Sequence, residues 1–347
     1  MALSHLGFVL AKPLLHRMDA EQAHGLTIGA LKAGLGGGQE AITSALLQTK
    51  LFGLDFPNPL GLAPGFDKNA EVPDAMLAQG FGFVEIGTVT PKPQSGNTRP
   101  RLFRLVEDQG VINRMGFNNE GHDVVLKRLE ARRSHGGIVG VNIGANKDAS
   151  DRIADYVSGL EKFRDVASYV TINISSPNTP GLRNMQGREE LLKLLSALNA
   201  KRQKTLPMLL KIAPDLAEAD LQDVADVCAR EAVDGVIVSN TTISRPPLKS
   251  QYAAETGGLS GRPLFDLSTK QLALFYKMTS GRLPLIGVGG VSDVETAWAK
   301  LRAGASLIQL YSALVYQGPA LVSAICQGLE QKLQAGGFAH LRDVVGH

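Results

Sequence analysis

The chain has 347 residues, of which 44% are hydrophobic and 20% charged, values typical of a soluble globular protein. This length allows one large α/β barrel or two smaller domains. A net charge of only +3 gives no electrostatic case for nucleic acid binding. Cys228 and Cys326 lie far apart, which excludes a CxxC redox or zinc pair and indicates a reducing compartment. No apolar run approaches the ~18 residues of a membrane span, and no signal peptide is recognisable.

The first 36 residues predict two short helices ahead of the main domain. Pro13 interrupts the first apolar stripe, and Asp19 is placed to cap a second helix. Residues 34–38 (GLGGG) are typical of a linker. Two roles stay open for this segment, a helical pair packed on the main domain or a contact with a membrane surface. The two roles have equal weight, and three basic residues, Lys12, Arg17 and Lys32, give weak support for contact with anionic lipid.

From about residue 47, apolar runs alternate with helical patterns. A small hairpin is predicted at 51–60, and eight runs then have the character of buried strands: 60–63, 82–88, 137–144, 169–175, 208–213, 235–239, 285–289 and 307–311. Helical patterns fill most gaps, for example at 124–132, 188–202, 217–230, 293–302 and 319–333. This alternation predicts a (β/α)8 barrel over residues 37–347. An open doubly wound sheet would require a GxGxxG fingerprint, which is absent.

Two segments depart from this alternation. Residues 91–119 form a connection too long for a βα turn, which predicts a functional lid or subsite. Residues 169–182 (YVTINISSPNTPGL) begin as a strand and end in a loop rich in amides and hydroxyls. Buried polar groups cost on the order of 1–3 kcal/mol each when unpaired, so this loop is expected to have partners.

In a parallel barrel the active site lies where strands end and βα loops begin. Lys211 is the most diagnostic residue there, because a lysine within a buried strand requires an anionic partner or a lowered pKa, unless the strand is an edge and the ammonium reaches water. Gly289 and Gly290, with the helix starts that follow Tyr311 and Ser312, match a barrel phosphate site. Other polar residues at strand ends are Lys68, Thr88, Asn142, Asn173, Ser175, Ser176, Ser239, Asn240 and Thr241.

These stretches resemble the dihydroorotate dehydrogenases, in particular the membrane-associated, quinone-dependent class 2. The resemblance extends in order over about residues 20–335. Two mild departures are Pro64, where the family would have Ala, and Ser239, where Thr is frequent. The matching stretches are 61–68 (GLAPGFDK), 85–90 (EIGTVT), 100–117 (PRLFRLVEDQGVINRMGF), 141–147 (VNIGANK), 171–181 (TINISSPNTPG), 211–215 (KIAPD), 240–242 (NTT), 257–263 (GGLSGRP), 287–291 (GVGGV) and 309–313 (QLYSA).

The resemblance implies FMN on the carboxyl-terminal face of the barrel and no metal. The residues it assigns to FMN are Ala63, Pro64, Gly65, Thr88, Asn142, Asn173, Lys211, Ser239, Gly261, Gly290, Tyr311 and Ser312, with Gly289 beside them. The residues it assigns to dihydroorotate or orotate are Lys68, Asn113, Arg114, Met115, Gly116, Phe117, Asn173, Asn178, Asn240 and Thr241.

The implied chemistry removes a proton from C5 of dihydroorotate and a hydride from C6, with the hydride passing to the flavin. Ser176 is expected to be the base, in a dry site with a proton exit through water or Thr179. Lys211 is expected to stabilise negative charge on the reduced flavin. Class 1 relatives use Cys as base, whereas this chain has Ser176 and an amino-terminal extension. That extension is expected to form a quinone tunnel with His24 and Arg104 near its polar end.

The expected function is therefore oxidation of (S)-dihydroorotate in de novo pyrimidine biosynthesis, with a membrane quinone as final acceptor. The expected location is the cytoplasmic face of a bacterial inner membrane, without transmembrane spans. Two alternatives stay open: another FMN-dependent pyrimidine reductase or dehydrogenase barrel, and a non-catalytic barrel that binds phosphate. Flavin absorbance of the purified protein would distinguish the last of these.

Overall fold

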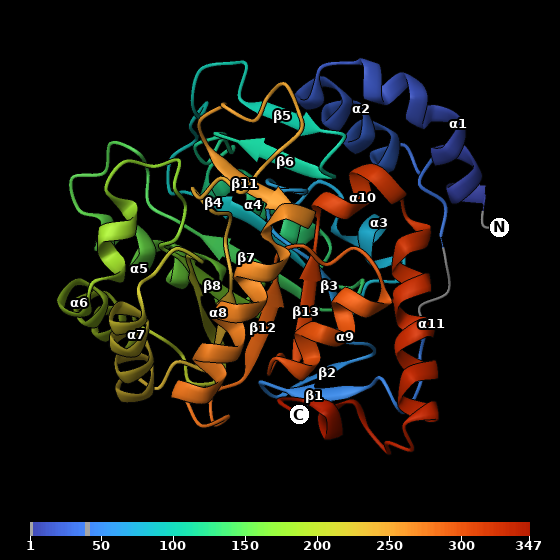
Figure 1. The fold of residues 1–347 in the computed structure, drawn as a ribbon. Coiled ribbons are helices and arrows are strands. Elements are labelled where there is room, and N and C mark those ends of the chain that lie inside the picture. Colours follow the sequence, from blue (N-terminus) through green and yellow to red (C-terminus); the bar gives the residue numbers. More distant parts are fainter. Residues whose placement is uncertain (1–2, 39–41) are drawn as a thin grey trace.

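The computed structural model describes residues 3–38 and 42–347, and within them eight parallel strands close into a barrel (Figure 1). Each strand pairs with the next along the chain, and the last pairs with the first. The strands are β3 (Leu60–Leu62), β4 (Phe83–Val89), β7 (Val139–Ile143), β8 (Tyr169–Asn173), β9 (Met208–Ile212), β10 (Gly235–Val238), β12 (Leu285–Val288) and β13 (Leu307–Leu310). The predicted (β/α)8 barrel is confirmed, and each of the eight predicted runs overlaps one barrel strand.

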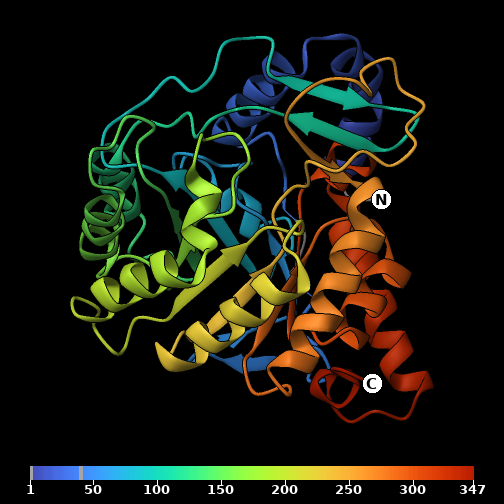
Figure 2. The ribbon, with the colours of Figure 1, turned by 60° about the vertical axis from the view of Figure 1, so that its left-hand side comes forward.

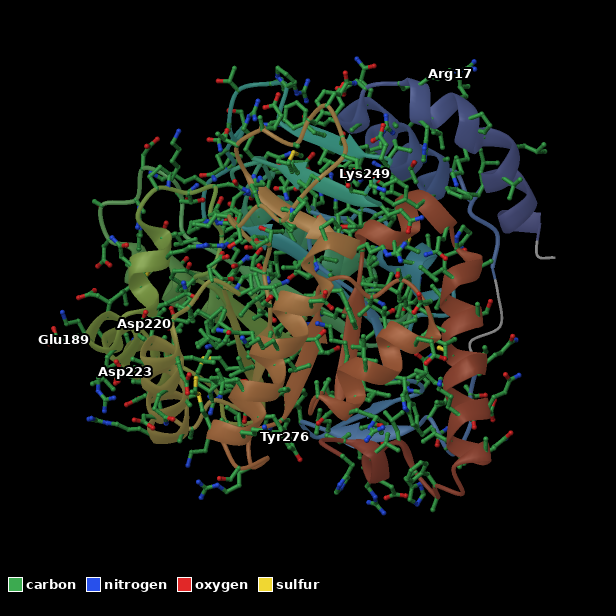
Figure 3. All side chains as sticks on the ribbon, viewed as in Figure 1. Arg17, Glu189, Asp220, Asp223, Lys249 and Tyr276 are labelled. Atoms are coloured by element: carbon green, nitrogen blue, oxygen red, sulfur yellow. The ribbon has the colours of Figure 1, made fainter. Side chains whose placement is uncertain are left out.

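Helices surround the barrel on the outside, as Figures 1 and 2 show from two sides. Their buried faces are apolar and their outer faces charged; Glu189, Asp220 and Asp223, for example, point outward from α6 and α7 (Figure 3). The helices are α3 (Pro73–Leu77), α4 (His122–Ala131), α5 (Arg152–Phe163), α6 (Arg188–Asn199), α7 (Glu218–Arg230), α8 (Phe265–Met278), α9 (Val294–Arg302), α10 (Ser312–Gln317) and α11 (Ala320–Ala335).

Large aromatic side chains fill the barrel interior against glycines of neighbouring strands. A Cβ on Gly61 would lie 2.3 Å from the Phe83 ring, and one on Gly140 would lie 2.1 Å from the Tyr169 ring. These glycines are therefore required by packing, because any side chain there would collide with an aromatic ring. The lower end of the barrel is closed by a hairpin that begins and ends earlier than the predicted range 51–60. It consists of β1 (Thr49–Leu51) and β2 (Leu54–Phe56), whose Phe56 packs edge-on against Phe83.

A three-stranded antiparallel sheet lies over the opposite end of the barrel (Figure 1). It consists of β5 (Leu102–Leu105), β6 (Gly110–Asn113) and β11 (Gly258–Gly261). The segment 91–119, which we predicted to be a lid or subsite loop, therefore contains two strands. Their partner β11 comes from the connection that follows β10, about 145 residues later in the chain.

The amino-terminal segment forms the two predicted helices, α1 (Leu3–Arg17) and α2 (Ala20–Lys32). The first helix continues through Pro13, which interrupts its apolar stripe. Asp19 caps the second as predicted, because its carboxylate accepts hydrogen bonds from the Glu21 and Gln22 amides. The side chains of Leu10 and Leu14 on α1 are 73% and 66% exposed. In the described part of the chain, no helix is long and apolar enough to cross a membrane.

Candidate active site

A cavity of about 740 Å³ extends from the amino-terminal helices to the carboxyl ends of the barrel strands. Its two ends differ in chemistry. Near the helices the wall is mainly apolar and includes Phe8, Ala11, Leu15, Ala23, Leu26, Ala30 and Leu31. At the strand ends the wall is polar and includes Lys68, Thr88, Asn113, Asn173, Ser176, Asn178, Lys211, Ser239, Asn240 and Thr241.

A network of amides and hydroxyls connects the ends of β4, β7 and β8. The Thr88 hydroxyl donates to Asn142 Oδ1 at 2.6 Å, and Asn173 Nδ2 donates to Thr88 Oγ1 at 2.9 Å. Asn240 Nδ2 donates to Ser175 Oγ at 2.9 Å, and that hydroxyl donates to Asn173 Oδ1 at 3.0 Å. Asn142 is fully buried behind this layer, so it orients Thr88 and Asn173, which line the cavity.

A buried carboxylate beneath this network was missed by the sequence analysis as a site residue. Glu85 is completely buried on β4 and accepts hydrogen bonds from Asn142 Nδ2 at 2.7 Å, Gln309 Nε2 at 2.7 Å and the Tyr169 hydroxyl at 3.0 Å. Three donors satisfy the charge in the barrel interior. The signal that could have revealed it was a carboxylate within an apolar strand, the same signal that identified Lys211.

Lys211 lies on β9 opposite Asn173 of β8, and only 5% of its surface is exposed. Burial lowers the pKa of its ammonium, and the field of Glu85 opposes that shift. The ammonium forms no hydrogen bond with another described residue, and the residue lines the cavity. Its charge is therefore available to an anionic or electron-rich ligand.

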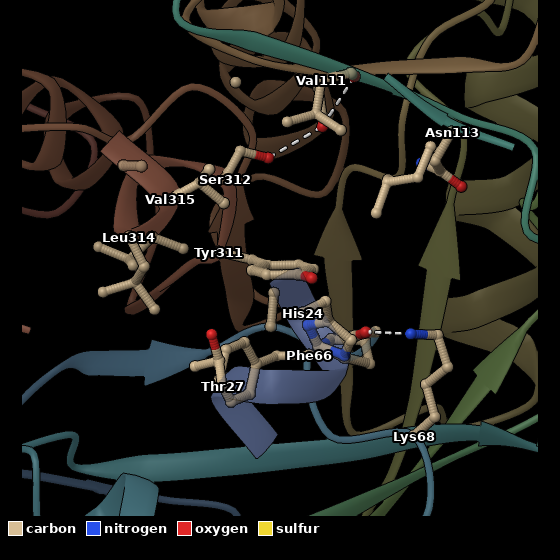
Figure 4. A pocket seen from close by; sticks show the side chains of 18 of the residues that line it. His24, Thr27, Phe66, Lys68, Val111, Asn113, Tyr311, Ser312, Leu314 and Val315 are labelled. Atoms are coloured by element: carbon tan, nitrogen blue, oxygen red, sulfur yellow. Dashed lines mark hydrogen bonds between the residues drawn. The ribbon is translucent and has the colours of Figure 1, made fainter. Parts of the chain in front are cut away.

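Lys68 lies on the other side of the cavity mouth, where its Nζ donates to the Gly65 carbonyl at 2.8 Å (Figure 4). Burial lowers the pKa of this lysine to about 8. Nearby, the Phe66 ring packs edge-on against both Tyr311 and His24, at centroid distances of 5.6 and 5.4 Å. These three rings lie between the polar and apolar parts of the cavity (Figure 4).

Ser176 is 6% exposed and follows β8 in the polar loop predicted to need partners. Its Oγ accepts a hydrogen bond from the Asn178 amide at 3.3 Å, which leaves its own proton free to point into the cavity. Asn178 Nδ2 in turn donates to Asn113 Oδ1 at 3.1 Å. Thr179, the expected proton exit, directly follows Asn178 in the chain and is buried.

The segment between β4 and α4 reaches over this loop. Asn97 Nδ2 donates both to the Arg114 carbonyl at 3.0 Å and to the Asn178 carbonyl at 3.1 Å. Met115, Gly116 and Phe117 line the cavity as expected. Arg114 is placed differently from its neighbours: its guanidinium pairs with Glu255 at 2.6 Å, outside the cavity wall.

Glycine turns border the cavity at the ends of β11 and β12. Gly289 and Gly290 have φ values of +103° and +77°, and a Cβ on Gly290 would lie 2.5 Å from Phe265 Cα. The turn can therefore only be built from glycine, and it presents bare backbone to the cavity. Ser312, at the start of α10, shares a 2.9 Å hydrogen bond with Ser260, next to Gly261. Ala63, Pro64, Gly65, Tyr311 and Ser312 line the same cavity.

The two residues predicted at the quinone end also line the cavity. His24 is half-buried on α2, and loss of solvation, reinforced by the charge of Lys68, lowers the pKa of its imidazole to about 3. It is therefore neutral at physiological pH. Arg104, on β5, donates to the Leu15, His16 and Met18 carbonyls at the end of α1. These charge-assisted hydrogen bonds attach the end of α1 to the three-stranded sheet of β5, β6 and β11.

These features define a class of protein: a (β/α)8 barrel whose site is polar at the strand ends, provides bare glycine backbone for an anion, and opens into an apolar passage under two helices. The family model for dihydroorotate dehydrogenase matches residues 46–333. The chain belongs to the dihydroorotate dehydrogenase family.

Individual relatives agree with this assignment. The chain is 60% identical over 340 residues to dihydroorotate dehydrogenase (quinone) of Parvibaculum lavamentivorans, with 98% of each chain covered. It is 54% identical over 345 residues to the protein of that name from Novosphingobium aromaticivorans, covering 98% of this chain and 99% of the relative. A crystal structure of DHODH in complex with ferulenol from Eimeria tenella superposes with a TM-score of 0.91 at 39% identity, covering 94% of each chain.

Proposed function

We propose that this protein oxidises (S)-dihydroorotate to orotate in pyrimidine biosynthesis, with FMN as hydride acceptor and a membrane quinone as final electron acceptor. The observation that supports this most directly is the single cavity with a polar and an apolar end. A polar, anionic substrate and a lipophilic oxidant could each reach a flavin between them without sharing an entrance. The relatives named dihydroorotate dehydrogenase (quinone) have both kinds of substrate in their name.

The residues present fit FMN. A flat ring system would find the hydrogen-bonding groups of Thr88, Asn173 and Lys211 along the strand ends, and a phosphate would find bare backbone at Gly289 and Gly290. Asn118 Oδ1, in the same cavity wall, is buried without a hydrogen-bond partner, which indicates that the site is completed by a ligand. Bound FMN would supply the hydride acceptor that no side chain can provide.

The protein's own residues would handle binding and the proton. We assign Lys68, Asn113, Asn178 and Asn240 to the ring and carboxylate of the substrate, because these side chains face the polar end of the cavity. Ser176 would accept the C5 proton at Oγ and pass its own hydroxyl proton to water or Thr179, in a position shielded from bulk water. Lys211, whose charged form is favoured by the field of Glu85, would stabilise negative charge that develops at the flavin's pyrimidine edge.

The amino-terminal helices would form the quinone side. We propose that residues 1–36 are a membrane-contact segment and that residues 37–347 form the FMN-binding barrel. The exposed Leu10 and Leu14 side chains of α1 suit an interfacial helix on a lipid surface. The corresponding location would be the cytoplasmic face of a bacterial inner membrane, with His24 and Arg104 near the inner end of the passage.

The test is to follow both half-reactions in the purified full-length protein. The protein should show flavin absorbance, and dihydroorotate should bleach it anaerobically in a stopped-flow instrument. Addition of a ubiquinone analogue should restore the absorbance. A colourless protein, or one that binds phosphate but no flavin, would support the non-catalytic barrel. A flavin that is reduced by NADH but not by dihydroorotate would support a different pyrimidine reductase.

A further inference from the structure

Lys300 is completely buried on α9, although nothing in the proposed reaction uses it. Its Nζ donates to the Ser268 hydroxyl at 2.6 Å and to the Val288 carbonyl at 3.3 Å, and it lies 5.4 Å from the centroid of the Phe265 ring. No carboxylate lies within ion-pair distance of it in the described part of the chain. Burying an ammonium costs several kcal/mol unless a negative charge compensates it. In the described part of the chain, Lys300 is therefore a buried amine whose charged form has no paired carboxylate.

Lys300 is surrounded by α8, by the end of β12 and by the glycine turn that follows β12. Ser268 and Phe265 belong to α8, Val288 ends β12, and the Gly289–Gly290 turn follows directly. Asp266, also on α8, is the charged side chain whose field reaches the ammonium, and β12 presents only the Val288 carbonyl to it. Burial outweighs the Asp266 field and lowers the pKa of Lys300 to about 7.

The same side chains that contact Lys300 also support the glycine turn. The Ser268 hydroxyl accepts from Lys300 and lies 3.0 Å from the Gly289 carbonyl, to which it can donate its single proton. A Cβ on Gly289 would lie 2.7 Å from Ser268 Oγ, so turn and hydroxyl are in direct contact. A Cβ on Gly290 would likewise lie 2.5 Å from Phe265 Cα. Lys300 is thus separated from the cavity face of the turn by one layer of atoms.

We propose that Lys300 is a positioning residue that places a positive charge directly behind the Gly289–Gly290 turn and thereby strengthens binding of the FMN phosphate to it. The inference rests on the proposed function, which places that phosphate at the turn. The ammonium does not touch the phosphate; it acts through the turn backbone, by its charge and by fixing Ser268. The bare amides bind the phosphate oxygens. The buried charge makes the electrostatic potential at these amides more positive, which strengthens their attraction for the phosphate.

The competing explanation is that Lys300 only fills space between α8 and α9. The two explanations differ in their effect on FMN compared with riboflavin, which has the same ring system but no phosphate. A space-filling role predicts that substitution weakens both flavins equally. A charge behind the phosphate turn predicts that only FMN is affected.

The experiment titrates flavin-free protein, prepared from the full chain, with FMN and with riboflavin, and follows quenching of flavin fluorescence. In Lys300→Met the ratio of the riboflavin to the FMN dissociation constant should fall by roughly tenfold or more, while riboflavin affinity stays within about twofold. Lys332→Met is the matched control, because Lys332 on α11 lies 5.6 Å from the Trp298 ring and pairs with Glu295 at 2.9 Å instead of contacting Ser268 or Val288. Its ratio should equal that of the wild type, and Lys300→Arg should recover part of the lost ratio.

A second measurement tests the proposal in the wild type, in case Lys300→Met does not fold. Titration calorimetry at pH 8 in buffers of different ionisation enthalpy reports proton uptake. FMN binding should take up a fraction of a proton more than riboflavin binding, because the phosphate, already a dianion at that pH, raises the pKa of Lys300. An unchanged affinity ratio in Lys300→Met, or equal proton uptake with both flavins, would overturn the proposal. A wild-type protein that binds neither flavin, or both equally, would instead overturn the proposed FMN site.

Discussion

At the scale of single residues, the two lysines at the cavity mouth differ in the partners that surround them. Lys211 faces the field of a buried carboxylate, Glu85, whereas Lys68 donates to a main-chain carbonyl near Glu21 and Asp67. Burial lowers the pKa of both ammonium groups. For Lys68 the lowered pKa, about 8, falls where ordinary assays can observe it.

The first prediction concerns the pH dependence of substrate capture. Lys68 is charged below a pH of about 8 and neutral above it, so its attraction for the substrate carboxylate is lost as pH rises through that value. The ratio kcat/KM for dihydroorotate should therefore fall by about tenfold per pH unit above pH 8. Lys68→Arg should move this decline to a higher pH, because guanidinium remains charged. An unchanged alkaline limb in Lys68→Arg would show that another group titrates.

The second prediction concerns the base. Ser176→Ala should retain FMN but reduce it with dihydroorotate several orders of magnitude more slowly, since the C5 proton loses its acceptor. Ser176→Cys should keep measurable activity with a pH profile shifted towards thiol ionisation. Single-turnover flavin reduction measures this step directly, and Ser175→Ala is the neighbouring control, expected to affect orientation more than proton transfer. Near wild-type reduction in Ser176→Ala would remove Ser176 from that role.

Residues differed in how visible their function was in the sequence. Lys211 was evident because a charge within an apolar strand has no ordinary structural explanation. Glu85 carried the same signal in the stretch GFVEIGT, but only the structure shows its three hydrogen-bond donors. Lys300 gave no signal, because a lysine in an amphipathic helix is normally solvent-exposed. The burial of Lys300 depends on how α8 packs against α9, and local sequence patterns do not predict that packing.

At the scale of elements, local patterns predicted every barrel strand but not the upper sheet. The barrel strands are buried on both faces, so each reads as a continuous apolar run. By contrast, β5 alternates half-buried and buried residues over only four positions, and β6 completes its pairing with β11, which is distant in sequence. Short strands with long-range partners are the least visible in local periodicity. Pro13 interrupts the apolar stripe in the sequence, yet α1 continues through it.

The third prediction concerns the ion pair between Glu21 on α2 and Arg101, which precedes β5. Glu21 accepts hydrogen bonds from Arg101 Nη2 at 2.7 Å and Nε at 3.0 Å, and the Arg101 side chain is only 5% exposed. Arg101 also donates to the Ser95 and Asn97 carbonyls, and Asn97 bonds to the loop that contains Ser176. Glu21→Gln should lower the free energy of unfolding by about 1–3 kcal/mol, because a buried guanidinium loses its charged partner.

Urea denaturation at pH 7 measures that loss. The pKa of Glu21 is lowered by its hydrogen bonds to Arg101, so the stabilisation is present at neutral pH and disappears as pH falls through the lowered pKa. The difference between Glu21→Gln and wild type should accordingly shrink in strong acid. Asp55→Asn is the matched control, since the Lys50–Asp55 pair is almost fully exposed and should contribute little. Equal effects of the two substitutions would show that the Glu21–Arg101 pair does not fasten α2.

At the scale of the whole molecule, the chain combines a barrel that could bind a flavin with a helix pair that adds an apolar entrance. The barrel face alone offers amides, hydroxyls and lysines, which suit an anionic substrate. The apolar wall comes largely from α1 and α2, and the aromatic group of His24, Phe66 and Tyr311 lies where the two parts meet. This arrangement separates the two half-reactions in space, so they should also be separable by deletion.

The final prediction follows from that separation. Removing residues 1–36 leaves every barrel strand and every polar strand-end residue in place, so the truncated protein should fold, retain FMN and be reduced by dihydroorotate. It should bind liposomes more weakly, because the exposed apolar side chains of α1 are gone. Turnover with a long-tailed quinone should fall far more than turnover with a small soluble dye, since the lipophilic acceptor loses its sheltered route.

If the helices only cover core surface, the truncation should instead aggregate or lose flavin. A soluble, yellow truncation that used the long-tailed quinone at the full rate would contradict the passage, because the acceptor would then reach the flavin without α1 and α2.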